Sequence, residues 1–322
     1  MNFQPYPIKF NPILKERIWG GTKLKTLLNK PITSDITGES WEISTVANDV
    51  SIVANGIYSG KSLNEIIADF PNEILGTNVH EQFGLEFPLL FKFLDAKQDL
   101  SIQVHPNDKL AKKNHNSFGK TEMWYIMQAD DNARIIVGFK ENASKEIYIK
   151  NLENKTITNI LDSKKVHQGD VFFLETGTVH AIGAGMVVAE IQQTSDVTYR
   201  IYDFDRKDAD GNLRELHTDL ALEAINFNKL ETQKQYSKNI NQSNEIVNCP
   251  YFTTNFIPLD GTMTIYQNLK TFRVYMCVDG IFDLVHNKIK YHYKKGDTIL
   301  IPAQMNDFEL SGQASLLEIY IL

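Results

Sequence analysis

Short apolar runs rich in Val, Ile, Phe and Tyr recur along the chain, and Gly, Asn and Asp separate them. Many short strands at close spacing, broken by turn residues, are typical of an antiparallel barrel or sandwich. The pattern therefore predicts a mainly β protein. The expected strands cover residues 89–95, 99–105, 122–128, 133–138, 170–174, 186–193 and 197–204, and then 253–258, 262–266, 272–277, 281–286, 289–293, 298–301 and 315–321.

Helical patterns are few. Residues 62–69 begin with Ser-x-x-Glu, the capping box that satisfies two free N–H groups at a helix start. Residues 218–225 show helical spacing of apolar positions, and residues 144–162 show a weaker version of it. We expect these helices to decorate a β scaffold.

A polar stretch rich in Lys, Gln, Asn, Ser and Glu, without an apolar period, runs from Asn228 to Asn248. Such composition is typical of an exposed linker. We therefore predict a first domain over 1–230, a polar linker over 231–249 and a C-terminal β domain over 250–322. A length of 322 residues suits two domains of ordinary size.

Composition narrows the class of protein. The chain is 42% hydrophobic and 23% charged, as in soluble globular proteins. A formal charge of -7 gives no reason to expect a nucleic-acid partner, since such partners need clustered Lys and Arg. No targeting pattern or run of 18 apolar residues is visible, so we expect a cytoplasmic protein that does not enter a membrane. Cys249 and Cys277 lack CxxC spacing and are expected to be reduced.

Four polar residues suggest a metal site. Gln103 and His105 are two apart in an apolar stretch, so on a strand both side chains leave the same face. Glu122 and His180 lie at the ends of two other strand-like segments. A lone histidine on an apolar strand is usually structural, but this mixed N/O set suits Zn²⁺ with an open position. Gln103 is the weakest candidate, because amide ligands are unusual for Zn²⁺.

A Gly-Asp pair followed by apolar residues occurs at 169–175 and again at 296–302. Aligning the two copies puts Phe272 and Asp307 where the first copy has its carboxylate and its second imidazole. The sequence thus predicts one β unit used twice, with a second copy that lacks the metal and contributes packing and closure of one side of the site. The alternative is that Gly-Asp is merely a common strand entry.

Other polar candidates follow the metal set. Glu190 alternates with apolar neighbours and is expected to face the barrel interior. Arg200 lies beyond a predicted turn, so parity does not fix its face. Glu190 and Arg200 could instead form a cross-strand ion pair of little energetic value. Lys120 could equally be a solvated loop residue.

The chain resembles the type I mannose-6-phosphate isomerases in their short bacterial form. The segments that carry the resemblance are 18–21 (IWGG), 91–94 (FKFL), 101–107 (SIQVHPN), 119–124 (GKTEMW), 177–182 (GTVHAI) and 190–206. The resemblance spans roughly residues 10–210, and Gln-x-His-Pro with the following Lys-Thr-Glu-x-Trp is its most specific part. Glu175 stands where cupins usually have Pro.

The resemblance implies two cupin-type β domains, with one Zn²⁺ per chain held by Gln103, His105, Glu122 and His180. It implies that Arg200 lies near the reacting carbons with Glu190 beside it. The residues implied to line the sugar-phosphate pocket are Trp19, Lys92, Ser101, Lys120 and Arg206.

The expected reaction interconverts mannose 6-phosphate and fructose 6-phosphate through a cis-enediol or enediolate. Glu190 is our first choice of base and Lys120 the second, because a carboxylate is already deprotonated at neutral pH. The alternatives are a cupin-type glucose-6-phosphate isomerase, an Fe(II) oxygenase and a non-catalytic phosphosugar-binding module. The sequence leaves a monomer or a dimer open.

Overall fold

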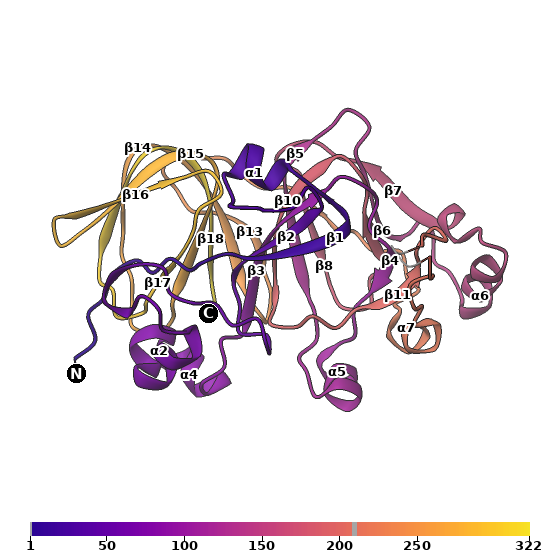
Figure 1. The fold of residues 1–322 in the computed structure, drawn as a ribbon, viewed down its shortest axis with the longest axis horizontal. Helices are drawn as coiled ribbons and strands as arrows, with labels where there is room; N and C mark the ends of the chain where they lie inside the picture. Colours follow the sequence, from indigo (N-terminus) through magenta and orange to yellow (C-terminus); the bar gives the residue numbers. More distant parts are fainter. Residues whose placement is uncertain (1, 208–210) are drawn as a thin grey trace.

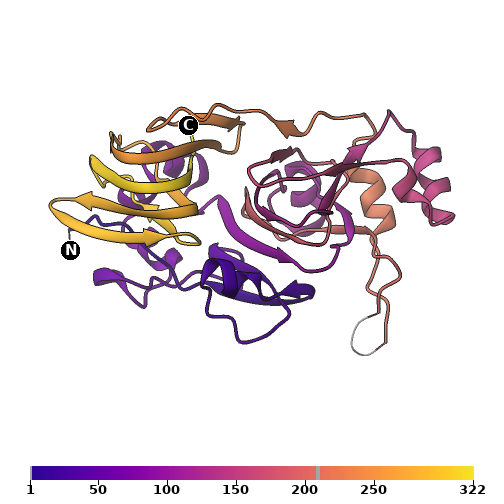
Figure 2. The same ribbon diagram turned by 90° about the horizontal axis from the view of Figure 1, so that it is seen from above.

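Two β units lie side by side in the computed structural model, which describes residues 2–207 and 211–322 (Figures 1 and 2). The first unit has a seven-stranded sheet of order β1-β2-β3-β10-β5-β8-β12 and a five-stranded sheet of order β11-β4-β9-β6-β7. In the second unit the order is β13-β14-β18-β15-β16, with β17 paired to β15. The mainly β prediction is confirmed.

The first unit contains β1 (Ile13–Gly21), β2 (Thr37–Ile43), β3 (Leu89–Ala96), β4 (Ile102–Val104), β5 (Glu122–Ala129), β6 (Arg134–Phe139), β7 (Leu161–Lys165), β8 (Val171–Leu174), β9 (His180–Ile182), β10 (Met186–Gln193), β11 (Tyr199–Tyr202) and β12 (Gln233–Lys234). The second contains β13 (Asn244–Asn248), β14 (Thr253–Ile265), β15 (Arg273–His286), β16 (Ile289–Lys294), β17 (Thr298–Ile301) and β18 (Phe308–Tyr320). Every pairing between these strands is antiparallel.

Short helices lie at the periphery of the sheets (Figure 1). The predicted capping box is present at the start of α2, where Ser62 and Glu65 bond to each other's backbone N–H. The expected helix over 144–162 is shorter, because the chain turns at 157–159 and enters β7. The α-helices are α1 (Lys23–Leu28), α2 (Leu63–Asp69), α3 (Pro71–Leu75), α4 (Thr77–Phe83), α5 (Asp108–His115), α6 (Lys145–Glu153) and α7 (Thr218–Ala224).

The seven-stranded sheet is a wall shared by both units. Strands β3 and β10 are buried along their whole length, so both of their faces are covered. Trp124 and Val188 point into the interior of the first unit. Their neighbours Met123 and Val187 point the other way, into a core that continues into the second unit. Because successive side chains of a strand point to opposite faces, one face of this sheet lines the interior of the first unit and the other packs against the second unit.

The first residues of the chain pair with the second unit as well as with residues 52–58 of the N-terminal part. Ile8 and Leu300 exchange two backbone hydrogen bonds of 2.8 and 2.9 Å. The segment expected as a linker over 231–249 contains β12, which pairs with β8, and β13, which pairs with β14. The two units are therefore joined by a segment that adds a strand to each of them, by the bridge between Ile8 and Leu300 and by their shared core.

Two expected strand breaks are continuous strands in the structure. Residues 253–258 and 262–266 are parts of β14, where Gly261 pairs with Gly312 inside the ladder. Residues 272–277 and 281–286 are parts of β15, which carries a bulge between Cys277 and Asp279. Polar and glycine residues were interpreted as turns, but here they mark irregular points within long strands.

The repeated Gly-Asp entry is confirmed at the level of hydrogen bonds. Gly169 and Gly296 both have a φ of 89°, a backbone conformation that favours glycine. Each donates a 2.8 Å bond to the strand opposite, to the carbonyls of Ile126 and Cys277 respectively. The turn is therefore the same structure in both units.

The strand register corrects one residue of the predicted alignment. Glu122 lies opposite Leu174 in β8, and Arg273 lies opposite Ile301 in β17. Leu174 and Ile301 each follow their Gly-Asp turn by the same number of residues. The counterpart of Glu122 is therefore Arg273 and not Phe272, because the alignment on threonine was displaced by one position.

Candidate metal centre and substrate cavity

The four predicted metal ligands come together inside the first unit. Gln103 lies on β4, His105 follows that strand directly, and Glu122 and His180 begin β5 and β9. Gln103 and His180 are register partners across β4 and β9. The two histidines and the glutamate are buried. As expected from parity, Ile102 and Val104 point to the opposite side, into a hydrophobic core.

The spacing of the ligand atoms fits one metal ion. Nε2 of His105 lies 3.5 Å from Oε2 of Glu122, and Nε2 of His180 lies 3.4 Å from Oε1. The amide nitrogen of Gln103 lies 3.2 Å from Nε2 of His180, and an amide flip would exchange it with the oxygen. Donor atoms on a tetrahedral Zn²⁺ with bonds near 2.1 Å are about 3.4 Å apart. The spacing therefore suits one ion, provided that the ammonium group of Lys120, which contacts Nε2 of His105 and Oε2 of Glu122, moves aside.

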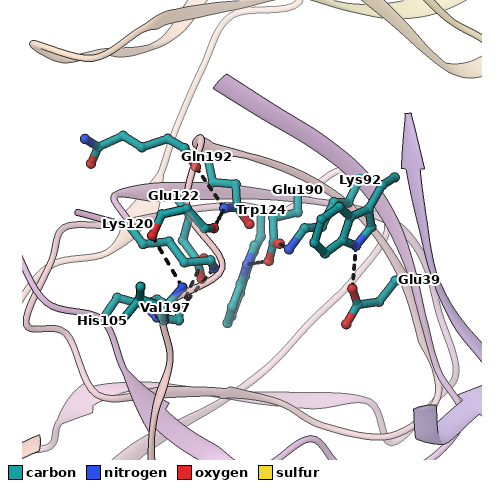
Figure 3. A network of polar contacts seen from close by, with 12 residues as sticks. Glu39, Lys92, His105, Lys120, Glu122, Trp124, Glu190, Gln192 and Val197 are labelled. Atoms are coloured by element: carbon teal, nitrogen blue, oxygen red, sulfur yellow. Dashed lines mark hydrogen bonds and ion pairs between the residues drawn. The ribbon is translucent and has the colours of Figure 1, made fainter. Parts of the chain in front are cut away.

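Backbone carbonyls fix the tautomers of both imidazoles. Nδ1 of His105 donates to the carbonyl of Val197 at 2.9 Å, and Nδ1 of His180 donates to that of Thr178 at 2.8 Å. A carbonyl only accepts, so each Nδ1 carries the proton and each Nε2 presents a lone pair. Figure 3 shows His105 between Val197 and the Lys120–Glu122 pair. Both lone pairs face Glu122.

The protonation states are those that a metal requires. Burial, with the nearby charge of Lys120, lowers the pKa of His105 to about 3, and burial also lowers the pKa of His180. Burial alone would raise the pKa of Glu122, but Lys120 and the two histidines outweigh it and hold that pKa well below its usual range. Within the described residues, Oε1 of Glu122 is buried without a hydrogen-bond donor. Neutral imidazoles and an unpaired carboxylate oxygen fit a cation at this point.

Lys120 is part of this cluster. Its ammonium group lies 3.1 Å from Nε2 of His105 and also contacts Oε2 of Glu122. The side chain is buried, which rules out the alternative of a solvated loop residue. Burial alone would lower the pKa of Lys120, but the carboxylates of Glu122 and Glu190 outweigh it, and the pKa is raised. Lys120 therefore brings a positive charge to the edge of the metal centre.

A cavity of about 380 Å³ opens beside the cluster. Most residues that were predicted to contact substrate line it, and the C-terminal unit contributes none of the residues that form it. That unit packs behind the sheet, as predicted, but it does not provide the predicted closure of one side of the site. The cavity is lined by Arg17, Trp19, Glu39, Trp41, Lys92, Leu94, Leu100, Ser101, Gln103, Lys120, Glu190, Asp196, Thr198, Arg200 and Arg214.

Glu190 faces the cavity as expected, but its ion-pair partner is not Arg200. Lys92 approaches the carboxylate at 3.1 Å, and the indole N–H of Trp124 donates to it at 3.0 Å (Figure 3). The ammonium group of Lys92 also lies 4.9 Å from the ring centre of Trp41. These contacts hold Glu190 in one orientation at the cavity wall.

Arg200 lies on β11, in register with Gln103 of β4. One of its Nη atoms donates to the carbonyl of Glu215 at 2.8 Å, while its buried Nε has no partner within the described residues. Burial and the nearby charge of Arg214 lower the pKa of Arg200. A buried N–H without an acceptor, on a side chain that lines the cavity, is suited to bind a ligand oxygen.

Arg206 is the one predicted pocket residue that does not line this cavity. Its guanidinium group contacts the carboxylate of Asp203 and the carbonyl of Asp99. In its place the structure brings Arg214 to the cavity wall. The sequence carries no periodic signal for Arg214, because this residue lies in an irregular segment after β11.

A second arginine was also missed. Arg17 forms a two-pronged ion pair with Glu39, with N–O distances of 2.8 and 3.3 Å. Arg17 and Trp19 are two apart on β1, and Glu39 and Trp41 are two apart on β2, so each pair shares a face. Parity would have identified these residues if β1 and β2 had been expected as strands.

Comparison with known proteins agrees with this site. Residues 8–155 match the family model described as the catalytic domain of type I phosphomannose isomerase, and residues 242–321 match the cupin domain of mannose-6-phosphate isomerase. Mannose-6-phosphate isomerase ManA of Bacillus subtilis is 39% identical over 96% of each chain. The mannose-6-phosphate isomerase of Streptococcus mutans is 34% identical over 97% of each chain.

Solved structures give the same result. The crystal structure of mannose 6-phosphate isomerase from Bacillus subtilis has a TM-score of 0.90 and 36% identity, covering 98% of this chain and 99% of that one. A mannose 6-phosphate isomerase described as bound with zinc and yttrium has a TM-score of 0.78 at 19% identity, which shows the fold alone. In the described part of the chain, no helix has the length and apolar character needed to cross a membrane. By sequence over nearly its whole length and by fold, the chain belongs to the type I mannose-6-phosphate isomerases of the cupin superfamily.

Proposed function

We propose that this protein is a zinc-dependent isomerase that interconverts mannose 6-phosphate and fructose 6-phosphate. The observation that carries the proposal is the convergence of His105, Glu122 and His180, whose ligand atoms lie within 4.8 Å of one another beside a charged cavity. The relatives that match over nearly the full chain are named for this activity. The alternatives considered above would use the same cluster and cavity, so the names of these relatives favour the mannose-6-phosphate isomerase.

Gln103, His105, Glu122 and His180 would hold the metal. Two imidazoles, one carboxylate and one amide oxygen favour Zn²⁺ over the hard cations that require oxygen ligands alone. With one carboxylate among the ligands, a bound Zn²⁺ would leave the centre with a charge of about +1, which stabilises negative charge on a substrate oxygen. We propose that each chain binds one such ion.

Glu190 is the proposed base that moves a proton between C1 and C2 of the open-chain sugar. Its contacts with Lys92 and Trp124 fix its position at the cavity wall. Arg200 would donate to the oxygen that becomes negative in the enediolate, using the N–H that has no acceptor among the described residues. Lys120 remains the second choice of base, but the carboxylates around it favour its ammonium form.

A turnover assay with two substrates tests this function. We expect mannose 6-phosphate to give fructose 6-phosphate in a coupled assay, with metal analysis of the same sample showing zinc. Chelation should abolish turnover, and added Zn²⁺ should restore it in the absence of oxygen. Faster turnover of glucose 6-phosphate would instead identify a glucose-6-phosphate isomerase, and binding without turnover would identify a phosphosugar-binding module.

Metal binding is expected to resist acid more than that of an ordinary histidine site. Protons compete with a metal for a free imidazole. At about pH 5 a histidine of pKa 6.5 therefore loses about 30-fold in metal affinity, and a site with two such histidines loses about 1,000-fold. The pKa of His105 is about 3 and that of His180 is also lowered, so both imidazoles stay neutral to a lower pH than a free histidine does. We expect a loss of less than about 30-fold between pH 7.5 and 5, measured by competition with a chelator of known pH dependence. A loss near 1,000-fold would contradict the burial of these imidazoles.

A further inference from the structure

The cationic side chains of the cavity differ in how fully protein carboxylates neutralise them. Arg17 pairs with Glu39, Lys92 with Glu190, and Lys120 with Glu122. Two arginines remain, on β11 and the segment that follows it: Arg200, which has no carboxylate partner among the described residues, and Arg214, which shares the carboxylate of Asp203 with Arg206. This wall of the cavity is therefore where positive charge is in excess.

The charge balance of this wall favours an anion. Arg200, Arg206 and Arg214 bring three guanidinium groups, while among the described residues Asp203 is the one buried carboxylate that faces them, and the exposed Glu215 also acts on Arg200. Asp196 also lines the cavity, but its side chain is exposed to solvent. The mutual repulsion of these guanidinium groups contributes to the lowered pKa of Arg200. A phosphate dianion would offset the remaining charge.

Asp203 holds Arg214 in one orientation. Its carboxylate, which is 4% exposed, accepts from Nε of Arg214 at 2.7 Å and from Nη2 at 2.6 Å. A guanidinium group has five N–H donors, so this fork leaves three for other acceptors. Arg206 contacts the same carboxylate but also donates to the backbone carbonyls of Asp203 and Asp99. Arg206 is thus turned away from the cavity that Arg214 lines.

The order of these residues along the cavity suits a sugar phosphate. Gln103 of the metal cluster is the register partner of Arg200, and Arg200 in turn bonds to the carbonyl of Glu215, the residue after Arg214. The order along the cavity is therefore metal cluster, Arg200, Arg214. If the carbonyl end of a six-carbon sugar lies at the metal, the phosphate on its sixth carbon lies toward Arg214.

We propose that Arg214, held in place by Asp203, binds the phosphate group of the substrate, and that Arg206 orients Asp203 without contacting substrate. This inference rests on the proposed function, because it takes a sugar phosphate as the ligand. Arg214 is then a substrate-binding residue, and Asp203 and Arg206 are positioning residues. The planar fork of arginine suits phosphate, since it offers two parallel donors.

The test compares substrates with and without phosphate. In Arg214→Ala we expect the KM for mannose 6-phosphate and the inhibition constant of inorganic phosphate to rise together by about 10–100-fold, the loss expected for a charged hydrogen-bonded group. The kcat should change far less, and turnover of unphosphorylated mannose should not change. Arg214→Lys should recover part of the affinity, and Asp203→Asn should show a smaller rise in KM. Removal of the exposed Arg134, as Arg134→Ala, is the matched control.

Three results would overturn the inference. One is an unchanged KM and inhibition constant in Arg214→Ala, and another is an equal loss with mannose and with mannose 6-phosphate. The third is a rise in KM in Arg206→Ala that Arg214→Ala does not show. Melting temperature and zinc content identify a variant that fails to fold. If the wild-type protein does not isomerise mannose 6-phosphate, the proposed function fails, while calorimetry with inorganic phosphate still decides whether Arg214 binds it.

Discussion

Replacement of His180 with alanine is expected to remove metal and activity together. His180 presents the Nε2 lone pair that faces Oε1 of Glu122, and its loss leaves an incomplete set of ligands. We expect the zinc content to fall below about one tenth of an ion per chain. A metal ion supplies several kcal/mol of transition-state stabilisation, so turnover should fall by about 10³-fold or more. Elemental analysis and the coupled assay on one sample measure both effects.

An exposed histidine gives the matched control for this variant. The His167 side chain is 71% exposed and lies outside the cavity, so His167→Ala should keep its zinc and its turnover. Full zinc content with normal activity in His180→Ala would show that His180 is not a ligand. A variant that keeps zinc but loses activity would assign His180 a different role in the site.

Replacement of Arg200 with alanine is expected to separate activity from metal content. Arg200 lines the cavity with an N–H that has no acceptor in the described part of the chain, but its side chain is not among the proposed metal ligands. Loss of one donor aimed at a developing oxyanion costs about 10²–10³-fold in turnover. We therefore expect kcat to fall by this factor, while zinc remains near one ion per chain.

The conservative variant makes the role of Arg200 more specific. Arg200→Lys keeps the charge but loses the planar fork, so it should recover only part of the turnover. Loss of zinc in Arg200→Ala would show that the residue supports the metal centre through Gln103, its register partner. A large rise in KM at constant kcat would place Arg200 with Arg214, as part of the proposed phosphate site.

The metal cluster could be predicted from the sequence because strand parity and spacing determine it. Gln103 and His105 share a face of β4, and Ile102 and Val104 pack into a core on the other side, as the alternation indicates. The neighbouring Glu122 belongs to a specific motif, 119–124, so the resemblance assigned its position. These signals come from residues that are close together in the chain, so they can be recognised in a single sequence.

Other parts of the cavity wall, on β1, β2 and the segment after β11, could not be predicted in the same way. Residues 13–21 and 37–43 carry charged and small residues at positions that an apolar pattern would reserve for the core, so β1 and β2 gave no strand signal. The choice between Arg206 and Arg214 depends on which guanidinium group the carbonyl of Asp99 engages. Such a contact arises from tertiary structure and leaves no periodic pattern.

The pairing of Ile8 with Leu300 has a consequence for how the chain folds during synthesis. These residues form reciprocal backbone hydrogen bonds although nearly the whole chain separates them. A ribosome that adds about 5–20 residues per second needs about 15–60 s to make the intervening segment. During that interval Ile8 lacks Leu300 and no second unit covers the packing face of the seven-stranded sheet, although residues 4–11 already bond to residues 52–58. Nascent chains stalled before β17 should therefore expose this apolar face, and should engage chaperones until the last strands emerge.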